Sequence, residues 1–537
     1  MLRAEGVEAM SSILLATLNA RYLHSAFGLR YLMANLGDLR READLAEFDI
    51  NQRPIEIAEA ILARNPRILG LGIYIWNVTP STELVAILKR ARPGLVIILG
   101  GPEVSFETGE QEIVRLADHV ITGEADRTFA DVCRTLLSSA APPLPRIIPA
   151  TLPDLGQLEL PYDLYTDDDT AHRVIYVEAS RGCPFTCEFC LSSLDVPVRQ
   201  FPLGRLLDSL QRLMDRGVRQ FKFVDRTFNL HLPTSTAILE FFLKQWRPGL
   251  FVHFEMVPDR LPEALRTIIA RFPPGALQFE VGIQTLNPDV EQRISRRQNQ
   301  ERMEDNLRWL RESTGVHIHA DLIAGLPGET LESFADGFDR LHSLGPQEIQ
   351  VGILKRLRGT PIIRHDQEWG MVYNPAPPYE VLQTNQMDFS TLSRLRRFAR
   401  FWDLFGNSGN FTESLALLWA SPSDDSPPAD PARSRSPFWS VLNFADWLHE
   451  RGVRTSGVAQ LRQFELLFHY LTEERRRPEP VVRPAIQRDF ERGGRHEMPA
   501  WLRSGERASP APKTSRASLP RRQRRHGSVS PAVSSDE

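Results

Sequence analysis

Three of the four cysteines in this chain fall within eight positions, in the stretch Cys183-Pro-Phe-Thr-Cys187-Glu-Phe-Cys190. Three thiolates on one short loop can hold three irons of a cubane cluster, which leaves the fourth iron open to an outside ligand. The spacing differs from zinc patterns that pair two Cys-x2-Cys knuckles or use two histidines, and a Cys3His zinc site is the alternative. Cys133 stands alone in a helical pattern, which indicates a small core residue.

The composition excludes several classes of protein. Of the 537 residues, 42% are hydrophobic and 25% charged, unlike collagen-like, coiled-coil or wholly disordered chains. Four cysteines are too few for a disulfide framework in so long a chain. The longest apolar runs are about half the ~20 residues that a membrane-spanning helix needs, and the first ten residues show no signal-peptide pattern. We therefore expect a cytoplasmic protein with reduced thiols and no membrane partner.

Two stretches of alternating strand and helix patterns precede a helical region. In residues 11–140 and 171–365 this alternation predicts α/β domains with parallel sheets, joined by a proline-rich linker at 141–170. The first is expected to be Rossmann-like, and ligands of such sheets bind at the carboxyl ends of the strands. The second has six strand–helix units, which predicts a partial (β/α)6 barrel, with an open sheet as the alternative.

The strands expected in the first domain are Ile13–Leu18, Asp44–Phe48, Ile68–Ile75, Leu95–Leu99 and His119–Thr122. Those expected in the second are Val174–Ala179, Phe221–Val224, Phe251–Met256, Leu277–Ile283, Val316–Ile323 and Ile349–Leu354. The cysteine loop directly follows the first strand of the second domain. It therefore lies at the strand ends where barrels of this kind carry their chemistry.

The remaining residues divide by composition. Residues 366–419 and 438–474 have helical periodicity, and the Ser-, Pro- and Asp-rich stretch 420–437 between them is expected to be a flexible insert. Residues 475–537 hold 15 Lys and Arg against seven Asp and Glu, whereas the rest of the chain has a net charge of −12. Because apolar residues thin out there as well, we expect a basic disordered tail.

Five motifs in this sequence resemble radical S-adenosylmethionine (SAM) enzymes, in the order and strand placement expected of that family. They are Ser180–Cys190, Val224–Asn229, Glu280–Thr285, Asp321–Glu329 and the stretch from Lys355 to Pro361 with Gly359-Thr360-Pro361. The resemblance implies a [4Fe–4S] cluster on Cys183, Cys187 and Cys190, with SAM on the fourth iron. It also implies reductive cleavage of SAM to methionine and a 5′-deoxyadenosyl radical, fed by an electron donor such as flavodoxin or ferredoxin.

Other site residues follow from the same resemblance. Phe189 would lie near the adenine of SAM, and Asp225, Glu255, Gln284 and Asp321 stand at strand ends where polar groups reach its ribose or methionine portions. Each of the four polar residues has a structural alternative; Asp225, for example, could pair with Arg226 instead.

An α/β domain ahead of such a barrel resembles the cobalamin-dependent class of this family. Glycine turns let a bulky planar ligand approach the backbone closely. The candidate cobalamin contacts are Asn19, Arg21, Tyr22, Tyr74, Asn77, Gly100, Gly101, Gly123 and Glu124. The Asp-x-His-x-x-Gly motif that supplies a histidine to cobalt is missing, and the nearest imidazole is His24. Cobalamin would then bind without a histidine ligand, and a plain scaffold domain is the alternative.

Residues 12–415 together resemble one subfamily, the cobalamin-binding-domain radical SAM proteins with a C-terminal domain of unknown function. The segments that carry this are Asn19–Ser25, Val224–Asn229, Pro377–Leu382 and Asn407–Phe411. The resemblance implies an enzyme that acts on an unactivated carbon of an unknown small-molecule or peptide substrate, by methyl transfer, cyclisation or rearrangement. The alternatives are a non-catalytic cluster or corrinoid sensor and, because of the basic tail, an RNA-modifying enzyme. The single cysteine cluster and the lack of a compact RNA-binding domain argue against nucleic acid as a partner.

Overall fold

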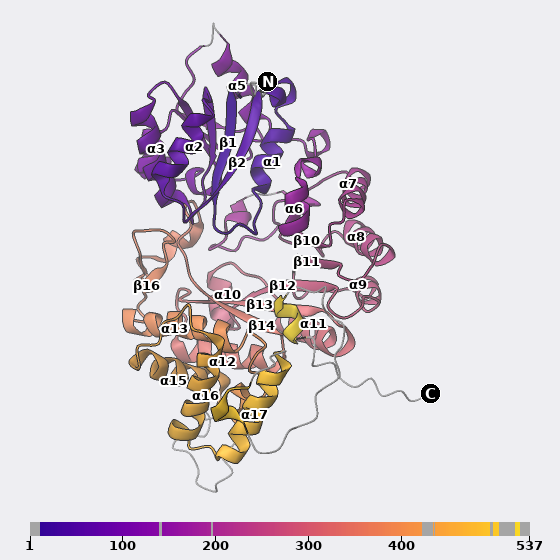
Figure 1. Cartoon of the computed structure of the whole chain (residues 1–537), viewed down its shortest axis with the longest axis vertical. Coiled ribbons are helices and arrows are strands. Elements are labelled where there is room, and N and C mark those ends of the chain that lie inside the picture. Colours follow the sequence, from indigo (N-terminus) through magenta and orange to yellow (C-terminus); the bar gives the residue numbers. More distant parts are fainter. Residues whose placement is uncertain are drawn as a thin grey trace, which may run out of the picture.

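The computed structural model describes residues 11–138, 142–194, 197–420, 433, 435–493, 498–503 and 521–526. Figure 1 shows an N-terminal α/β domain at one end, a curved parallel sheet in the middle and a helical region at the other end. Within the described residues, no helix is long and apolar enough to cross a membrane.

The N-terminal domain is built on a fully parallel sheet in the order β2-β1-β3-β4-β5-β6. Apolar clusters cover both faces, which explains the continuous hydrophobic runs of its strands. The strands are β1 (Ile13–Asn19), β2 (Ala43–Asp49), β3 (Ile68–Gly72), β4 (Val96–Gly100), β5 (His119–Thr122) and β6 (Ile147–Pro149). The helices are α1 (Phe27–Ala34), α2 (Pro54–Ala63), α3 (Val78–Ala91), α4 (Glu112–Leu116) and α5 (Thr128–Leu137). The strand order reverses at β1, and the sixth strand lies in the stretch expected to be a linker.

The central sheet is also fully parallel, in the order β14-β13-β12-β11-β10-β7. Its strands are β7 (Ile175–Val177), β10 (Gln220–Phe223), β11 (Phe251–Met256), β12 (Leu277–Gln284), β13 (His317–Ala324) and β14 (Glu348–Ile353). Its outer helices are α7 (Leu203–Asp215), α8 (Leu232–Lys244), α9 (Glu263–Ile269), α10 (Pro288–Arg293), α11 (Gln300–Ser313) and α12 (Leu331–Ser343). Strands β7 and β14 are its edges, so this is a partial barrel of six strands.

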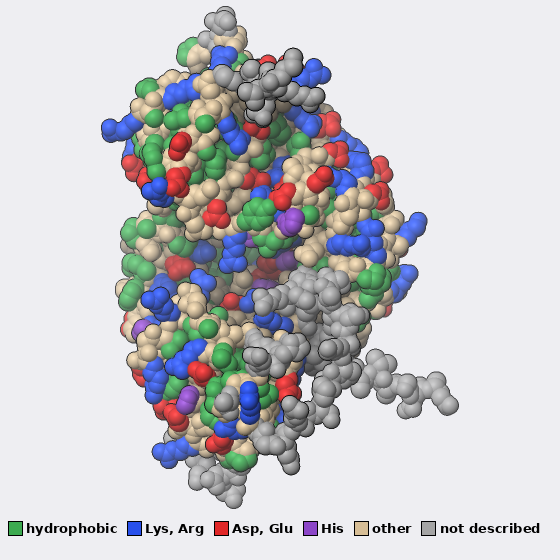
Figure 2. Space-filling view, viewed as in Figure 1, with side chains coloured by type: hydrophobic (Ala, Val, Ile, Leu, Met, Phe, Trp, Pro, Cys, Tyr) green, Lys and Arg blue, Asp and Glu red, His purple; other side chains and the backbone are tan. Residues whose placement is uncertain are grey.

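The inner face of the barrel is polar. Strand residues alternate between faces, and those on the inner side include Lys222, His253, Glu280 and His319, whereas neighbours such as Phe279 pack outward against the helices. Figure 2 shows the molecule hollowed between the N-terminal domain and the helical region, with histidine and acidic side chains inside the hollow. Barrel interiors are ordinarily filled by branched apolar residues, so this one is built as a chamber.

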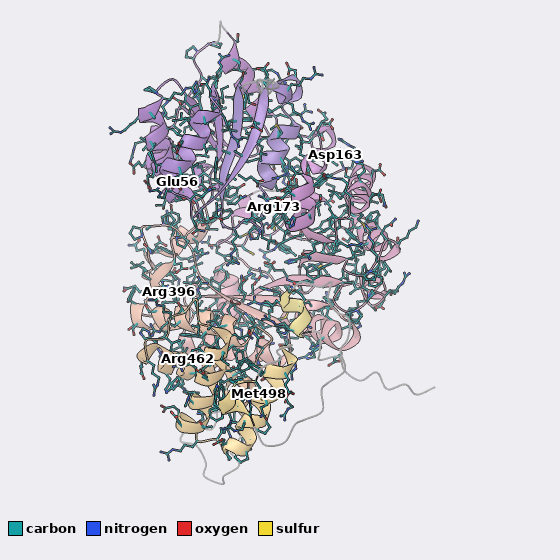
Figure 3. All side chains as sticks on the ribbon, viewed as in Figure 1. Glu56, Asp163, Arg173, Arg396, Arg462 and Met498 are labelled. Carbon is teal, nitrogen blue, oxygen red and sulfur yellow. The ribbon has the colours of Figure 1, made fainter. Side chains whose placement is uncertain are left out.

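Two short elements join the domains. The strands β8 (Ser180–Arg181) and β9 (Arg199–Gln200) form a hairpin around the cysteine loop, and α6 (Asp167–His172) begins with a capping box from Thr166. Arg173, labelled in Figure 3, lies where the two α/β domains meet, and its guanidinium is 2.8 Å from Glu47. Arg30 in α1 bridges Glu47 and Asp169 from the other side.

The helical region consists of α13 (Phe389–Phe405), α15 (Pro437–Glu450), α16 (Gln460–His469), α17 (Glu479–Arg492) and α18 (Arg521–His526). It packs on the barrel through an aromatic cluster in which Phe338 of α12 meets Phe398, Trp402 and Phe438. Most of the stretch expected to be a flexible insert, residues 421–432 and 434, lies outside the described residues.

The expectation of a disordered tail from residue 475 is wrong for two segments. Helix α17 buries Val482, Ile486 and Phe490, whose spacing of four residues is that of a helix face. The abundance of arginine and proline around this pattern concealed it. Helix α18 docks at the amino end of the barrel, where Arg522 is 2.9 Å from the buried Glu348. Part of the basic charge is therefore neutralised inside the molecule.

Candidate active site

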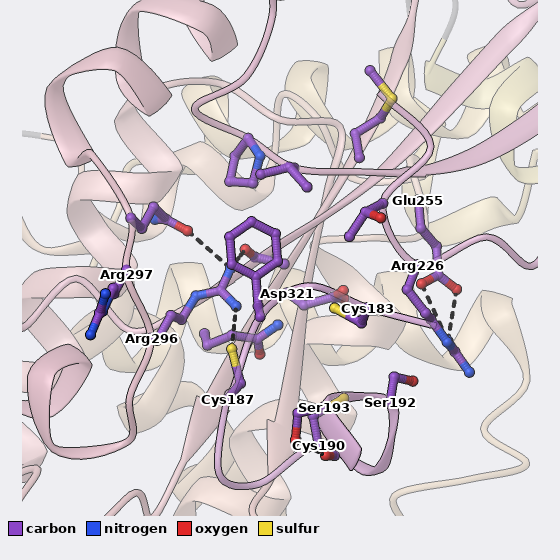
Figure 4. A pocket seen from close by; sticks show the side chains of 18 of the residues that line it. Cys183, Cys187, Cys190, Ser192, Ser193, Arg226, Glu255, Arg296, Arg297 and Asp321 are labelled. Atoms are coloured by element: carbon purple, nitrogen blue, oxygen red, sulfur yellow. Dashed lines mark hydrogen bonds and ion pairs between the residues drawn. The ribbon is translucent and has the colours of Figure 1, made fainter. Parts of the chain in front are cut away.

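The three clustered cysteines line one cavity of about 180 Å³ at the carboxyl ends of the barrel strands (Figure 4). Cys183 and Cys187 are each 8% exposed, and Cys190 is half-buried. Burial raises the pKa of Cys183 and Cys187. In the described residues no three ligating side chains converge tightly enough to hold a single metal ion. The three cysteines thus surround a cavity and do not form a tight site for one metal ion. Three thiols that face a shared cavity suit a cubane cluster.

The cysteine loop is fixed mainly through Glu188, which is 2% exposed. Its backbone N–H donates to Ile294 and its carbonyl accepts from Ile362. Its carboxylate accepts from Ser295 at 2.5 Å and pairs with His365 at 2.8 Å. A glutamate between two cysteines therefore ties the loop to two distant segments of the chain.

Four of the residues expected to contact SAM line this cavity with the cysteines: Phe189, Glu255, Gln284 and Asp321. Burial raises the pKa of Glu255, although Arg226 at 3.0 Å opposes it. Burial also raises the pKa of Asp321, which His319 partly offsets. Gln284 has a φ of +72° beside an irregularity in the β12–β13 pairing, and this turns its side chain into the cavity.

Asp225 is not among the residues that line this cavity. It follows the end of β10 and is 2% exposed, whereas its neighbour Arg226 lines the cavity. The Asp225 carboxylate accepts hydrogen bonds from the Ala179 N–H at 2.9 Å and the Ser180 hydroxyl at 2.6 Å. Burial raises its pKa to about 7. Asp225 thus supports the start of the cysteine loop, and Arg226 occupies the place expected for it.

Two further residues of the cavity were missed. Arg226 lies in the turn after β10, next to Asp225 and inside the motif Val224–Asn229 that the sequence had singled out. Arg296 donates to the Cys187 sulfur over 3.7 Å, and the two are 109 residues apart. Nothing in the sequence signals that contact.

A second cavity, of about 220 Å³, lies at the carboxyl edge of the N-terminal sheet. Of the expected cobalamin contacts, Tyr74, Gly100, Gly101 and Gly123 line it. Its wall also contains Gly28, Gly70, Gly72 and Arg181. Gly101 has a φ of +109°, and a Cβ there would lie 2.4 Å from the Ile73 carbonyl. Glycine at that position is therefore required by the packing of the chain itself. A Cβ at Gly100 or Gly123 would meet no non-neighbouring atom nearer than 3.8 Å, so the bare backbone there leaves room that fits a bulky ligand.

The other expected cobalamin contacts lie elsewhere. Asn77 is fully buried and ties its loop to Leu18 and Gly72. Asn19 bonds Glu47 and the His24 carbonyl, and Tyr22 is exposed and donates to Asp168. Arg21 is exposed beside them.

Glu124 lies at the contact with the barrel domain, where it pairs with Arg181 at 2.8 Å and with Arg199. A second contact joins the domains on the other side of the sheet edge. Arg358 bonds Glu103 at 3.0 Å and Glu107 at 3.2 Å, and Tyr379 donates to Glu103 at 2.7 Å. Both contacts use residues that follow the glycine turns of the second cavity.

Comparison with known families agrees with this geometry. Residues 177–341 match the radical SAM superfamily, residues 13–133 match the B12 binding domain, and residues 367–534 match a protein family of unknown function, DUF4080. The chain thus contains a radical SAM domain and a B12-binding domain. These families imply a [4Fe–4S] cluster, SAM and cobalamin as its cofactors. The DUF4080 match runs to residue 534, so the subfamily resemblance does not stop near residue 415 as expected.

Individual relatives of this chain are distant in sequence. It is 25% identical to the cobalamin-dependent radical SAM methyltransferase TokK of Streptomyces tokunonensis over 68% of this chain and 58% of that protein. It is 24% identical to 2-(S-pantetheinyl)-carbapenam-3-carboxylate methyltransferase of Streptantibioticus cattleyicolor over 53% of this chain and 46% of that protein. The chain thus spans about half the length of these curated relatives.

Solved structures share the fold. The methyltransferase TsrM of Kitasatospora setae, with cobalamin and a [4Fe–4S] cluster bound, has a TM-score of 0.54 at 16% identity, covering 69% of this chain and 82% of that one. The cobalamin-dependent SAM radical enzyme OxsB, with aqua-cobalamin bound, has a TM-score of 0.56 at 13% identity, covering 90% and 84%. In this chain the same fold places a glycine-lined cavity and a cysteine-lined cavity in adjoining domains.

Proposed function

We propose that this protein is a cobalamin-dependent radical SAM enzyme that modifies an unactivated carbon of its substrate, with methyl transfer as the favoured outcome. The main support is that Cys183, Cys187 and Cys190 line one cavity together with Glu255, Gln284 and Asp321. The glycine-lined cavity of the other domain is joined to the same loop through Arg181. The cluster would supply the electron that cleaves SAM, and cobalamin would carry the methyl group.

The protein's own part is to bind and orient. The three thiols would hold three irons, and Phe189 and Gln284 would border SAM beside them. The ion pair of Glu255 and Arg226 offers both a carboxylate and a cation to the amino acid part of SAM. Two observations support these assignments. All of these residues line one cavity, and their charged and polar groups complement the charged groups of SAM.

The inner wall of the barrel favours a polar substrate. Lys222 is 3.3 Å from Glu280, His253 is 2.9 Å from Glu280, and His319 is 3.3 Å from Asp321. Glu280 and Asp321 also line the cysteine cavity. A chamber walled by paired charges would reject an apolar molecule, because these groups would lose water without gaining partners. We therefore propose a substrate with several hydrogen-bonding groups.

The test is a product assay on anaerobic protein. The chain is reconstituted with iron and sulfide, loaded with hydroxocobalamin, reduced with dithionite and incubated with SAM and the polar fraction of a metabolite extract. Methyl transfer predicts both 5′-deoxyadenosine and S-adenosylhomocysteine. Cobalamin-free protein is the matched control and should still form 5′-deoxyadenosine while losing S-adenosylhomocysteine. Absence of a broad absorption near ~400 nm after reconstitution would refute the cluster. If the reconstituted protein never cleaves SAM, the proposal that it is an enzyme is refuted.

A further inference from the structure

Arg296 is the cation that contacts a cysteine of the loop. Its Nη1 donates to the Cys187 sulfur over 3.7 Å, and its Nη2 donates to the Gly282 carbonyl and, over 2.9 Å, to Gln298. Its Nε–H is buried and has no hydrogen-bond partner. Among the described residues, Nη1 thus has the cysteine sulfur as its acceptor, Nη2 has two oxygen acceptors and the buried Nε–H has none.

The position of Arg296 is set by the residues just before it. The Ile294 carbonyl accepts from the Glu188 N–H at 3.1 Å, and the Ser295 hydroxyl donates to the Glu188 carboxylate at 2.5 Å. Ser295 has a φ of +55°, so the chain turns sharply between this anchor and Arg296. Residues 294–296 thus contact two successive residues of the loop, Cys187 and Glu188, and hold them in register.

Arg297 provides an internal comparison. It carries the same charge and lines the same cavity. In the described structure no hydrogen bond or ion pair joins it to a cysteine. The two neighbouring arginines therefore differ in direct contact with sulfur, and this separates a hydrogen bond from a general effect of positive charge.

We propose that Arg296 sets the reduction potential of the cluster by donating a hydrogen bond to the Cys187 sulfur, with the Glu188–Ser295 contact positioning it. Reduction adds one electron from an external donor and increases the negative charge on the cluster and its sulfur ligands. A charged N–H donor stabilises that reduced state more than the oxidised one, so it makes the cluster easier to reduce. The inference rests on the proposed cluster, and it concerns a positioning and tuning role rather than contact with substrate.

The experiment is a redox titration of reconstituted protein, in which the reduced cluster is followed by electron paramagnetic resonance. At a fixed ambient potential, Arg296→Gln is expected to lower the ratio of reduced to oxidised cluster on the order of tenfold, because it removes a charged N–H donor from the Cys187 sulfur. Arg297→Gln is the matched control and should change that ratio much less. Ser295→Ala keeps both charges and should shift the ratio in the same direction as Arg296→Gln.

The outcomes separate this inference from the proposed function. Wild-type protein without a cluster contradicts the proposed function. A wild-type cluster whose potential is unchanged in Arg296→Gln, or equally changed in Arg297→Gln, overturns the role of Arg296. Weaker SAM binding at an unchanged potential also overturns it. If Arg296→Gln cannot hold a cluster, Arg296→Met, which keeps the side-chain length, and Ser295→Ala carry the test, and wild-type potentials in both would refute it.

Discussion

The guanidinium of Arg181 lies 2.8 Å from the carboxylate of Glu124, across the junction between the B12-binding domain and the barrel. Arg181 precedes the first cysteine of the loop by two residues, and Glu124 follows the glycine turn at Gly123. Asp126 at 2.8 Å and Glu178 at 2.9 Å complete the charge network. Arg181 lines the glycine cavity and lies two residues before Cys183, so buried ion pairs join the two domains close to both cavities.

Arg181→Gln should destabilise the protein and weaken cobalamin binding together. Arg181 is 13% exposed, and its loss leaves buried carboxylates without a partner, a change that typically costs about 3–5 kcal/mol. Urea denaturation and equilibrium dialysis with hydroxocobalamin measure the two effects. Arg134→Gln is the control, because Arg134 pairs with Asp38 on the surface at 44% exposure and should contribute less than about 1 kcal/mol. Equal stability of the two variants would contradict the buried network.

The four cysteines should separate into three ligands and one core residue. Replacing Cys183, Cys187 or Cys190 by Ala should abolish the absorption near ~400 nm after reconstitution, because a cubane needs all three protein thiolates. Cys133→Ala should keep the full iron content, since Cys133 is fully buried in the N-terminal core, where burial raises its pKa to about 12. Iron and sulfide analysis per chain checks this. Loss of iron in Cys133→Ala would show that the assignment is wrong.

Gly100→Val should weaken cobalamin binding without unfolding the N-terminal domain. Gly100 ends β4 and lines the glycine cavity, and a Cβ there would meet only the Ile121 carbonyl, at 3.8 Å. The added side chain would occupy ligand space, and overpacking of 1–3 kcal/mol predicts a roughly tenfold or greater loss of affinity. Gly94→Val, just before the same strand and in open space, is the control. If Gly100→Val and Gly94→Val bind hydroxocobalamin equally well, the corrinoid does not bind in the glycine cavity.

Glu329 should make stability depend on pH. It is 2% exposed, and burial raises its pKa to about 8 despite a hydrogen bond from Thr285. A carboxyl whose folded pKa is raised contributes stability below its unfolded pKa of about 4.3, and this is lost as pH rises through about 8. Glu329→Gln should therefore flatten the decline in unfolding free energy between pH 5 and 9, by on the order of 4 kcal/mol. Glu332→Gln is the control: Glu332 is exposed at the start of α12, three residues further on, and its replacement should leave the decline unchanged.

Much of the fold follows from patterns that are local in sequence. Alternating apolar runs gave both parallel sheets, because each strand is buried on one or both faces and so carries its own signal. The cysteine motif is likewise local, because its three cysteines lie within eight positions of the sequence. Asp225 shows the limit of motif resemblance: its place in a motif suggested a ligand contact, whereas it bonds the start of the cysteine loop and its neighbour Arg226 lines the cavity.

The rest depended on contacts that are distant in sequence. Arg296 meets Cys187, and Glu188 meets His365, across more than 100 residues each. Such pairs form only once the barrel has brought its strand ends together, so no local pattern marks them. The residues at the domain junction are similar: Glu124, an expected cobalamin contact, pairs with Arg181, and no local pattern marks that pair.

Arg522→Ala should release α18 from the amino end of the barrel and destabilise the protein. Glu348 is 2% exposed, and although burial opposes its ionisation, hydrogen bonding to His317 and the charge of Arg522 keep its pKa below the usual range. Without Arg522, fewer groups stabilise the buried negative charge of Glu348. The unfolding free energy should therefore fall by about 2 kcal/mol. Hydrogen exchange should also rise in the amide groups around His317 and Glu348. Arg451→Ala, which breaks a half-exposed pair with Glu474, should change neither quantity appreciably. A variant as stable and as protected as wild type would show that α18 does not close the barrel in solution.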